Sequence, residues 1–371
     1  MMRRILFFAA STIALAACLG LLASGLRLEG RPPGRRAPGL FGKKQQSYIS
    51  QTLNFFEKKE SAADFELTYG WRDFRSGDAY ATFTISKDGL AGAEKEFGYT
   101  QEELDRALQE RAEKLKTEMI VELKAKARAW IAQGPYSAHL SVEDKDPYAF
   151  NLKLAAPAEI HARVKAEFNR IAALVQEEQK RILKKQEKDL EAARLEFLEG
   201  RGLRIMGEKI GVDYGRCVDR NQPRLKLTLE ALRRVRKDAS LHDFLGLLVA
   251  FIQEIRYGMP DLMEGNKYVL GFWVPPRVLV NNSGDCDSKG VVFGALWKSF
   301  KKYPLLIFKI PDHMFIGVAI PSLSEEGTVR LNGLMYTLCE VTGPEKLPPG
   351  LITPYSRSYL QSGRFLYEII Q

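Results

Sequence analysis

The chain has 371 residues, of which 45% are hydrophobic and 27% charged, and its formal net charge is +9 at pH 7. This length predicts two or three structural units with room for a sizeable core. Residues 1–44 hold eight Lys or Arg and one acidic residue, so seven of the nine net positive charges lie there and the rest of the chain is nearly neutral. A nearly neutral folded part argues against nucleic acid as a partner.

Residues 1–26 have the pattern of a signal or membrane segment, because Arg3 and Arg4 precede an uncharged apolar run to Leu26. The run is about 22 residues long, enough to span a bilayer. Three interpretations stay open: an uncleaved anchor, a secretory signal cleaved near Ala23-Ser24-Gly25, or a lipoprotein signal in which Cys18 is lipidated. The anchor and the lipoprotein signal would tether the chain to the cell envelope, and the cleaved signal would secrete it. In each case the folded part is expected outside the cytoplasm. The basic cluster of residues 27–44 is instead typical of a cytoplasmic flank.

Residues 27–45 are basic and proline-containing, which indicates an extended linker. Residues 46–205 are predicted to form a helical region with a small hairpin. Its first element is a short amphipathic helix at 46–60. Alternating apolar and polar residues at 65–71 and 78–86, on either side of a turn at 75–78, indicate the hairpin.

Two long helices follow. Thr100 and Glu103 form a capping box, and apolar residues then recur at helical spacing until Gly134-Pro135 ends the helix. A second helix begins near Pro157 and ends at Gly200 and Gly202, and the residues between the helices suggest two short strands. The pattern predicts an antiparallel coiled-coil hairpin. Such a pair would serve as a spacer or as a docking arm for a protein partner, unless it is an ordinary helical layer.

Residues 206–371 show helices first and strands afterwards. Helices are expected at 225–235, 241–255 and 286–303, with a loop at 276–282. Strands are expected at 305–309, 314–320, 328–331 and 334–341. This order predicts an α+β domain with an antiparallel sheet.

Cys286 is the leading candidate for a catalytic residue, because it lies at a loop-to-helix junction after Gly284-Asp285. A helix N-terminus favours a thiolate, whereas the flanking Asp285 and Asp287 oppose it. His313 and Glu340 follow on strands, and a Cys, His and acid in this order provide a nucleophile, a base and an orienting group.

The backbone N–H of Cys286 would supply half of an oxyanion hole. The amide of Asn281 or Asn282 is a candidate for the other half.

The stretch from about Val212 to Gly343 resembles the bacterial transglutaminase-like superfamily, which includes cysteine peptidases. The matching pieces are Phe251 to Tyr257, Trp273 to Pro276, Gly284 to Lys289, the strand around His313, and Cys339 to Thr342. The resemblance implies a papain-like fold, a Cys286-His313-Glu340 triad and acyl chemistry on a protein or peptide amide. It favours hydrolysis over transamidation. A non-catalytic binding or scaffold module of the same fold remains the alternative.

The sequence contains no phosphate-binding loop, dinucleotide fingerprint or HExxH motif, so neither a cofactor nor a metal is expected. Cys217 and Cys339 are left over from the site. They either pair in an oxidising compartment or stay as buried free thiols.

Overall fold

The computed structural model describes residues 53–75, 77–321, 327–343 and 345–370, together with the backbone of two N-terminal strands, β1 (Arg3–Ala9) and β2 (Arg27–Leu28). The chain divides into two compact units. One contains residues 1–27 and 100–198, and the other contains residues 28–99 and 199–371. The described residues combine helices with several antiparallel sheets, so the predicted α+β class is confirmed.

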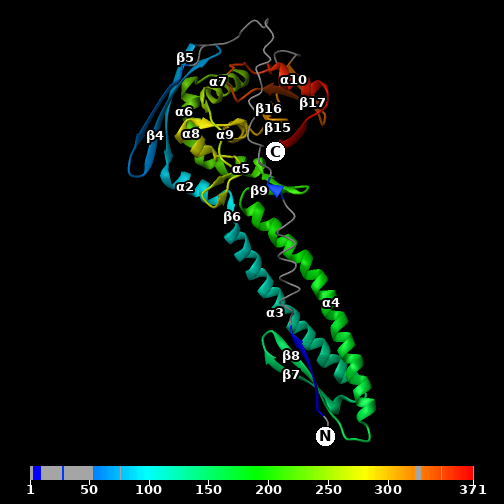
Figure 1. Cartoon of the computed structure of the whole chain (residues 1–371). Coiled ribbons are helices and arrows are strands. Elements are labelled where there is room, and N and C mark those ends of the chain that lie inside the picture. Colours follow the sequence, from blue (N-terminus) through cyan, green and yellow to red (C-terminus); the bar gives the residue numbers. More distant parts are fainter. Residues whose placement is uncertain are drawn as a thin grey trace. The chain divides into compact units, whose positions relative to one another are not determined.

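The first unit is built on two long antiparallel helices, α3 (Gln101–Gln133) and α4 (His161–Gly200), which lie side by side in Figure 1. The predicted capping box starts α3, with the Thr100 side chain accepting from the Glu103 N–H. Between the helices, Gln186 Nε2 donates to the Leu115 carbonyl at 2.6 Å. The antiparallel pairing therefore agrees with the sequence, while the supercoiling of a coiled coil stays a prediction.

A small sheet covers one end of this helix pair. Strands β7 (Leu140–Asp146) and β8 (Ala149–Ala155) form a hairpin whose Phe150 packs with Phe168 of α4 in one apolar cluster. The short 3-10 helix η1 (Ser137–His139) precedes β7. The two strands expected between the long helices are thus confirmed.

Strand β1 pairs antiparallel with β8, from Arg3 opposite Ala155 to Ala9 opposite Ala149. This part of the predicted membrane segment is therefore a strand, because its backbone groups pair with β8. Residues 10–26, with Cys18, and most of the predicted linker lie outside the described residues. Within the described ranges, no helix has the length and apolar character needed to cross a membrane.

The second unit begins with a three-stranded antiparallel sheet, β3 (Phe55–Glu60), β4 (Asp64–Asp73) and β5 (Gly77–Ser86). The predicted hairpin is β4–β5. The helix expected at 46–60 is wrong for residues 55–60, which pair as a strand with β4. Ring contacts between Phe56 and Tyr69, at 4.9 Å, accompany this pairing. The sheet belongs to the same compact unit as the C-terminal region, and not to the long helices as the sequence suggested.

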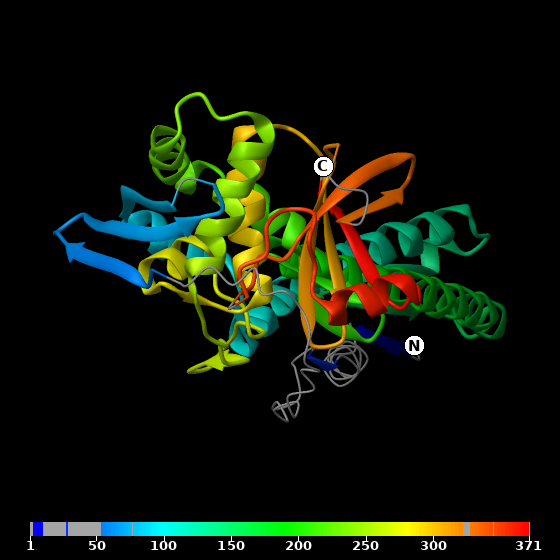
Figure 2. The same cartoon turned by 90° about the horizontal axis from the view of Figure 1, so that it is seen from above.

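Helices occupy the middle of this unit, and Figure 2 shows them between the β4–β5 sheet and the C-terminal sheet. Their bounds are α2 (Lys87–Glu96), α5 (Tyr214–Asn221), η2 (Pro223–Leu225), α6 (Lys226–Val235), α7 (Leu241–Glu254), α8 (Pro275–Asn281) and α9 (Cys286–Phe300). Helices α6 and α7 pack on β5 and β4, where Phe251 meets the rings of Tyr69 and Trp71. The loop expected at 276–282 is mostly the helix α8, because prolines suit a first helical turn.

The C-terminal sheet has the order β17-β18-β16-β15-β19. Its strands are β15 (Leu305–Ile310), β16 (His313–Val318), β17 (Thr328–Leu331), β18 (Leu334–Cys339) and β19 (Leu366–Ile370), and α10 (Pro354–Gln361) precedes β19. Helix α9 packs on β16 at Gly290, where a Cβ would lie 2.6 Å from the Met314 methyl group. The sequence expectation of four antiparallel strands in this region is confirmed.

Short strands complete the described elements. They are β6 (Tyr99–Thr100), β9 (Leu203–Met206), β10 (Lys209–Val212), β11 (Arg256–Tyr257), β12 (Met263–Glu264), β13 (Lys267–Tyr268) and β14 (Ser283–Gly284). The pair β11–β14 is parallel and places Tyr257 opposite Gly284, two residues before Cys286.

We expect Gly343→Ala to lower the free energy of unfolding by about 2–3 kcal/mol, as conformational strain adds to a backbone clash. Gly343 has φ +69°, and a Cβ there would lie 2.9 Å from the Gln253 carbonyl oxygen. Gly333 is the matched control, because its φ is +79° and a Cβ there has no described atom within 4 Å. Gly333→Ala should cost only about 1 kcal/mol in chemical denaturation. Equal losses in the two variants would contradict the close approach at Gly343.

Candidate functional site

Cys286 is the first residue of α9, and its backbone is fixed from both sides. Asp285 caps the helix through a 3.0 Å bond in which its Oδ1 accepts from the Ser288 N–H. On the other side, the parallel pairing of β14 with β11 holds the approaching chain. The Cys286 residue is only 1% exposed. The predicted loop-to-helix junction is therefore present, and the thiol lies beneath the surface.

Two carboxylates surround the Cys286 sulfur. The thiol donates a hydrogen bond to Asp287 Oδ1 at 3.1 Å, and the other oxygen of Asp287 accepts from the Tyr214 hydroxyl. Ligand-type atoms of Asp285, Cys286 and Asp287 all lie within 4.8 Å of one another. Unit charges at this separation repel by roughly 3 kcal/mol at an effective dielectric constant of about 20. These contacts favour a neutral thiol, so ionisation requires nearby positive charge.

These three groups are also the one cluster of metal-ligand type found among the described residues. Asp287 is already engaged by Tyr214 and by the thiol. Burial, followed by the charge of Asp287, raises the pKa of Tyr214 well above its ordinary value, so its hydroxyl remains a donor. Both Asp287 oxygens therefore accept hydrogen bonds from groups of the protein.

His313 and Glu340 form the second part of the site. His313 begins β16, Glu340 directly follows β18, and His313 Nε2 lies 2.7 Å from Glu340 Oε2. With an ionised Glu340 as acceptor, Nε2 carries the proton and Nδ1 of the neutral ring is left to accept one. The expected pairing of His313 with Glu340 is therefore present.

Glu340 is a well-supported anion. Its Oε1 accepts from the backbone N–H and the hydroxyl of Thr353, both at 3.2 Å, and from the Ser356 hydroxyl. Burial raises the pKa of Glu340, but the hydrogen bond and charge of His313, with the Ser356 and Thr353 donors, outweigh it and hold the pKa below its ordinary value. A stable carboxylate in this position orients His313.

Lys289 is a residue that the sequence analysis did not single out as functional. It lies one helical turn after Cys286, its residue is 0% exposed, and its Nζ donates to the Thr342 carbonyl at 2.5 Å. Burial lowers the pKa of Lys289 to about 7, against the opposing charges of Asp285 and Cys286. The sequence signal that could have identified Lys289 is its position as a lysine at the start of an otherwise apolar helix.

Gln253 was also missed. Its Nε2 donates to the Glu340 carbonyl at 2.5 Å and to the Leu347 carbonyl at 2.9 Å. The next residue of α7, Glu254, forms a buried ion pair with Lys346. Side chains of α7 and α9 therefore hold the backbone that carries Glu340.

The two oxyanion candidates differ in their surroundings. Asn281, the last residue of α8, is exposed, whereas Asn282 is buried in a left-handed conformation with φ 47°. Asn282 Oδ1 has no hydrogen-bond partner among the described residues. The oxyanion role of either amide stays a prediction.

Trp273 and Pro276 belong to the stretch that resembles the transglutaminase-like superfamily. The Trp273 backbone N–H donates to Ser288 Oγ at 3.0 Å, and its indole N–H donates to Glu264. Pro276 lies in the first turn of α8. These contacts give both residues a structural explanation.

Cys217 and Cys339 are both buried and free, so the disulfide alternative is wrong for this structure. Burial raises the pKa of each thiol far above its ordinary value. Neither is suited to nucleophilic chemistry.

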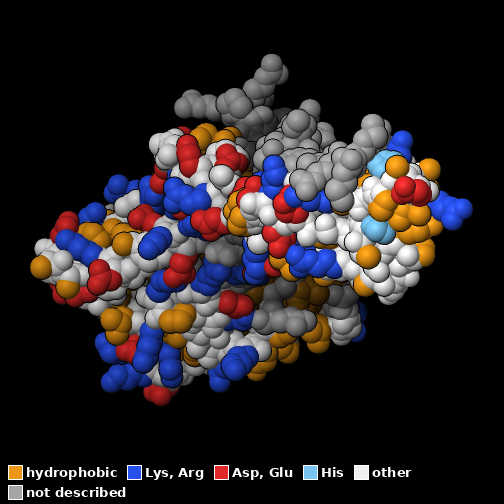
Figure 3. All heavy atoms as spheres, turned by 90° about the horizontal axis from the view of Figure 1, so that it is seen from below, with side chains coloured by type: hydrophobic (Ala, Val, Ile, Leu, Met, Phe, Trp, Pro, Cys, Tyr) orange, Lys and Arg blue, Asp and Glu red, His pale blue; other side chains and the backbone are white. Residues whose placement is uncertain are grey.

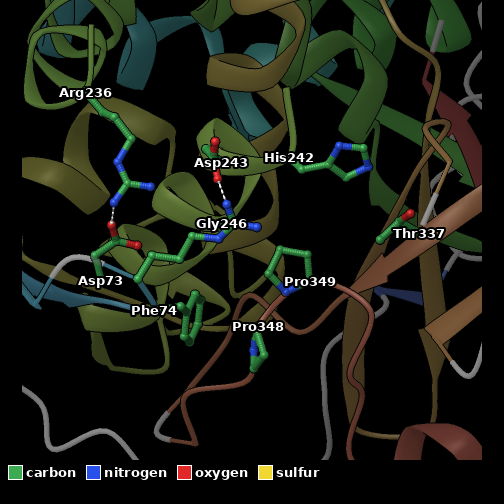
Figure 4. A pocket seen from close by; sticks show the side chains of 10 residues that line it. Asp73, Phe74, Arg236, His242, Asp243, Gly246, Thr337, Pro348 and Pro349 are labelled. Carbon is green, nitrogen blue, oxygen red and sulfur yellow. Dashed lines mark hydrogen bonds and ion pairs between the residues drawn. The ribbon is translucent and has the colours of Figure 1, made fainter. Parts of the chain in front are cut away.

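A separate hollow of about 560 Å³, a volume that includes open solvent, lies between the first turns of α7 and the end of β4. Figure 4 shows the ion pair of Asp73 with Arg236 and the side chains of Asp243, His242 and Thr337. Asp243 also forms an ion pair with Arg75. The charges of its walls cancel. None of the three predicted catalytic residues lines it.

Surface charge is mixed. On the face shown in Figure 3, basic and acidic side chains alternate over the same elements and do not separate into large fields of one sign. Mixed charge of this kind gives a weak long-range field.

Comparison with known proteins found no matching family model, no matching curated protein and no matching solved structure.

We expect Glu340→Gln to lower the free energy of unfolding by about 2 kcal/mol at neutral pH, because the charged partner of His313 is lost. The folded-state pKa of Glu340 is depressed below 4.5, so its contribution is present above this pH and is lost as the pH falls through the folded value. The difference between wild type and Glu340→Gln in denaturant titrations should therefore shrink in acid. A difference that is constant down to low pH would contradict the charged pairing.

A second pH effect should come from Lys289. Its folded pKa of about 7 lies below the ordinary 10.5, so between these values the unfolded chain binds a proton that the folded chain does not. Stability of the wild type should thus rise with pH in this window, by up to about 1.4 kcal/mol per unit, relative to Lys289→Met. Parallel stability curves for the two proteins would show that Lys289 keeps an ordinary pKa.

Proposed function

We propose that residues 206–371 form the catalytic part of a transglutaminase-like, papain-like domain that performs cysteine-dependent acyl chemistry on a protein or peptide amide. Cys286 is the nucleophile, His313 the base and Glu340 the orienting acid. The observation that carries this proposal is the 2.7 Å contact between His313 and a fully hydrogen-bonded Glu340, on the sheet against which α9 packs.

The chemistry follows from the tautomer that Glu340 favours. His313 Nδ1 takes the thiol proton, the sulfur attacks the amide carbonyl carbon, and the carbonyl electrons move to the oxygen. Collapse of this intermediate breaks the C–N bond, and the imidazolium gives its proton to the leaving amine. Water, activated by the same ring, then hydrolyses the thioester and restores the thiol. Hydrolysis is favoured over transfer to an amine because of the resemblance to bacterial peptidases.

Catalysis needs a change at Cys286. In the structure, the thiol is buried and donates to Asp287, so the reacting state must expose the sulfur and exchange Asp287 for His313. We therefore propose that, in the reacting state, the Cys286 sulfur contacts the His313 ring.

The same observation favours a second candidate, a non-catalytic binding module of this fold. A buried neutral thiol bonded to a carboxylate is what a structural cysteine would show. In this alternative, the long helices α3 and α4 present the module to a protein partner.

We further propose that the protein acts in the cell envelope. The support is the sequence pattern of residues 1–26, as an anchor, a lipoprotein signal with Cys18, or a cleaved signal. Fractionation of cells that express the full chain or a Cys18→Ser variant, with mass measurement of the mature N-terminus, separates these three forms.

A thiol probe tests the catalytic proposal. We expect iodoacetamide to label Cys286 near neutral pH, and His313→Ala to slow this labelling by roughly 100-fold, the usual scale of a general base. Cys217 and Cys339 are internal controls, because both are buried with raised pKa values and should stay unlabelled in the folded protein.

Hydrolysis of a fluorescent protein substrate, and incorporation of a fluorescent amine, would then report the two possible outcomes. Both activities should be lost in Cys286→Ala. A Cys286 that is labelled no faster than Cys217, with no activity on any substrate, would favour the binding module.

A further inference from the structure

Two carboxylates lie beside the Cys286 sulfur, and their negative charge opposes formation of a thiolate. Asp285 and Asp287 lie within 4.8 Å of the sulfur and of each other. Asp285 is required as the N-cap of α9, and Asp287 is fixed by Tyr214, so neither carboxylate is placed to turn away. A thiolate formed here would be a third negative charge in one buried cluster.

We propose that Lys289 is a positioning residue of this site, a buried cation that offsets the charge of Asp285 and favours ionisation of Cys286. The inference rests on the proposed cysteine chemistry and adds a fourth residue to it. Lys289 acts through the sulfur and touches no substrate.

The geometry supports this assignment in two ways. Residues three apart on a helix share a face, so Lys289 lies on the Cys286 side of α9. Its ammonium is tied to the Thr342 carbonyl at 2.5 Å, two residues beyond Glu340. One side chain thus connects the helix of the nucleophile to the strand end that carries the acid.

The charged groups facing Lys289 come from three elements. Asp285 and Cys286 belong to α9, Glu254 to α7, and Lys346 to the segment after β18. Lys346 is already neutralised by its buried ion pair with Glu254. The positive charge of Lys289 therefore acts mainly on Asp285 and Cys286, at the N-terminal end of α9.

The proton equilibrium of Lys289 fits this role. Burial lowers its pKa to about 7, and the charges of Asp285, Cys286 and Glu254 act in the opposite direction. With a pKa of about 7, Lys289 is only partly protonated near neutral pH in the folded protein. Formation of a Cys286 thiolate favours its ammonium form, so the two groups ionise together.

The test is the pH dependence of Cys286 alkylation in the full-length protein, followed by peptide mass spectrometry with iodoacetamide. We expect Lys289→Met to move the midpoint of the profile upward by about one unit, so that labelling at pH 7 is about tenfold slower. Lys298→Met is the matched control, since Lys298 lies in the last turn of the same helix and pairs with Asp219. It should leave the midpoint unchanged.

The results distinguish the role of Lys289 from the role of Cys286 as a nucleophile. Slow labelling of wild-type Cys286, unaffected by His313→Ala, would overturn both. Fast labelling of the wild type with an unchanged midpoint in folded Lys289→Met would overturn the role of Lys289 alone. Lys289→Gln, which keeps a donor for Thr342 but no charge, serves if Lys289→Met does not fold, and it should show the same upward shift. An unshifted Lys289→Gln would likewise overturn the proposal.

Discussion

The segment that follows β18 is the constraint on which the rest of the site depends. Its carbonyl groups are buried beside helices whose own backbone bonds are already made, so side chains must supply the donors. Gln253 bonds to the Glu340 carbonyl and Lys289 to the Thr342 carbonyl. Gly343 then passes so close to Gln253 that a Cβ has no room. These contacts fix the Glu340 carboxylate, and through it the ring of His313.

The start of α9 shows how one residue can serve folding and oppose chemistry. Asp285 stabilises the helix by accepting from Ser288, as an N-cap should. The same charge lies beside the sulfur and disfavours a thiolate. Asp287 adds to this effect and also holds Tyr214. The proposed cysteine chemistry calls for positive charge near the sulfur, and within the described residues Lys289 is a buried lysine on the same face of α9.

Much of this architecture follows from local sequence signals. The Thr100 capping box and the apolar spacing after it predicted the long helix, and the order of helices and strands predicted the α+β class. The pairing of His313 with Glu340 was also predictable, because a Cys is followed, in this order, by a His and an acid on predicted strands. The helix predicted at 46–60 was wrong over residues 55–60, because two adjacent phenylalanines fit a helix as well as a strand and only pairing with β4 decides between them. Lys289 and Gln253 were missed because their partners lie 53 and 87 residues away, which no local pattern reveals.

In the proposed mechanism, Cys286, His313 and Glu340 act as one unit. Nitrogen-15 NMR of the His313 ring tests it most directly, by following both ring nitrogens against pH in the wild type and in Cys286→Ala. We expect a protonated Nε2 that is bonded to Glu340, and an Nδ1 signal whose pH dependence changes when the thiol is removed. Identical titration curves for His313 in the two proteins would contradict it.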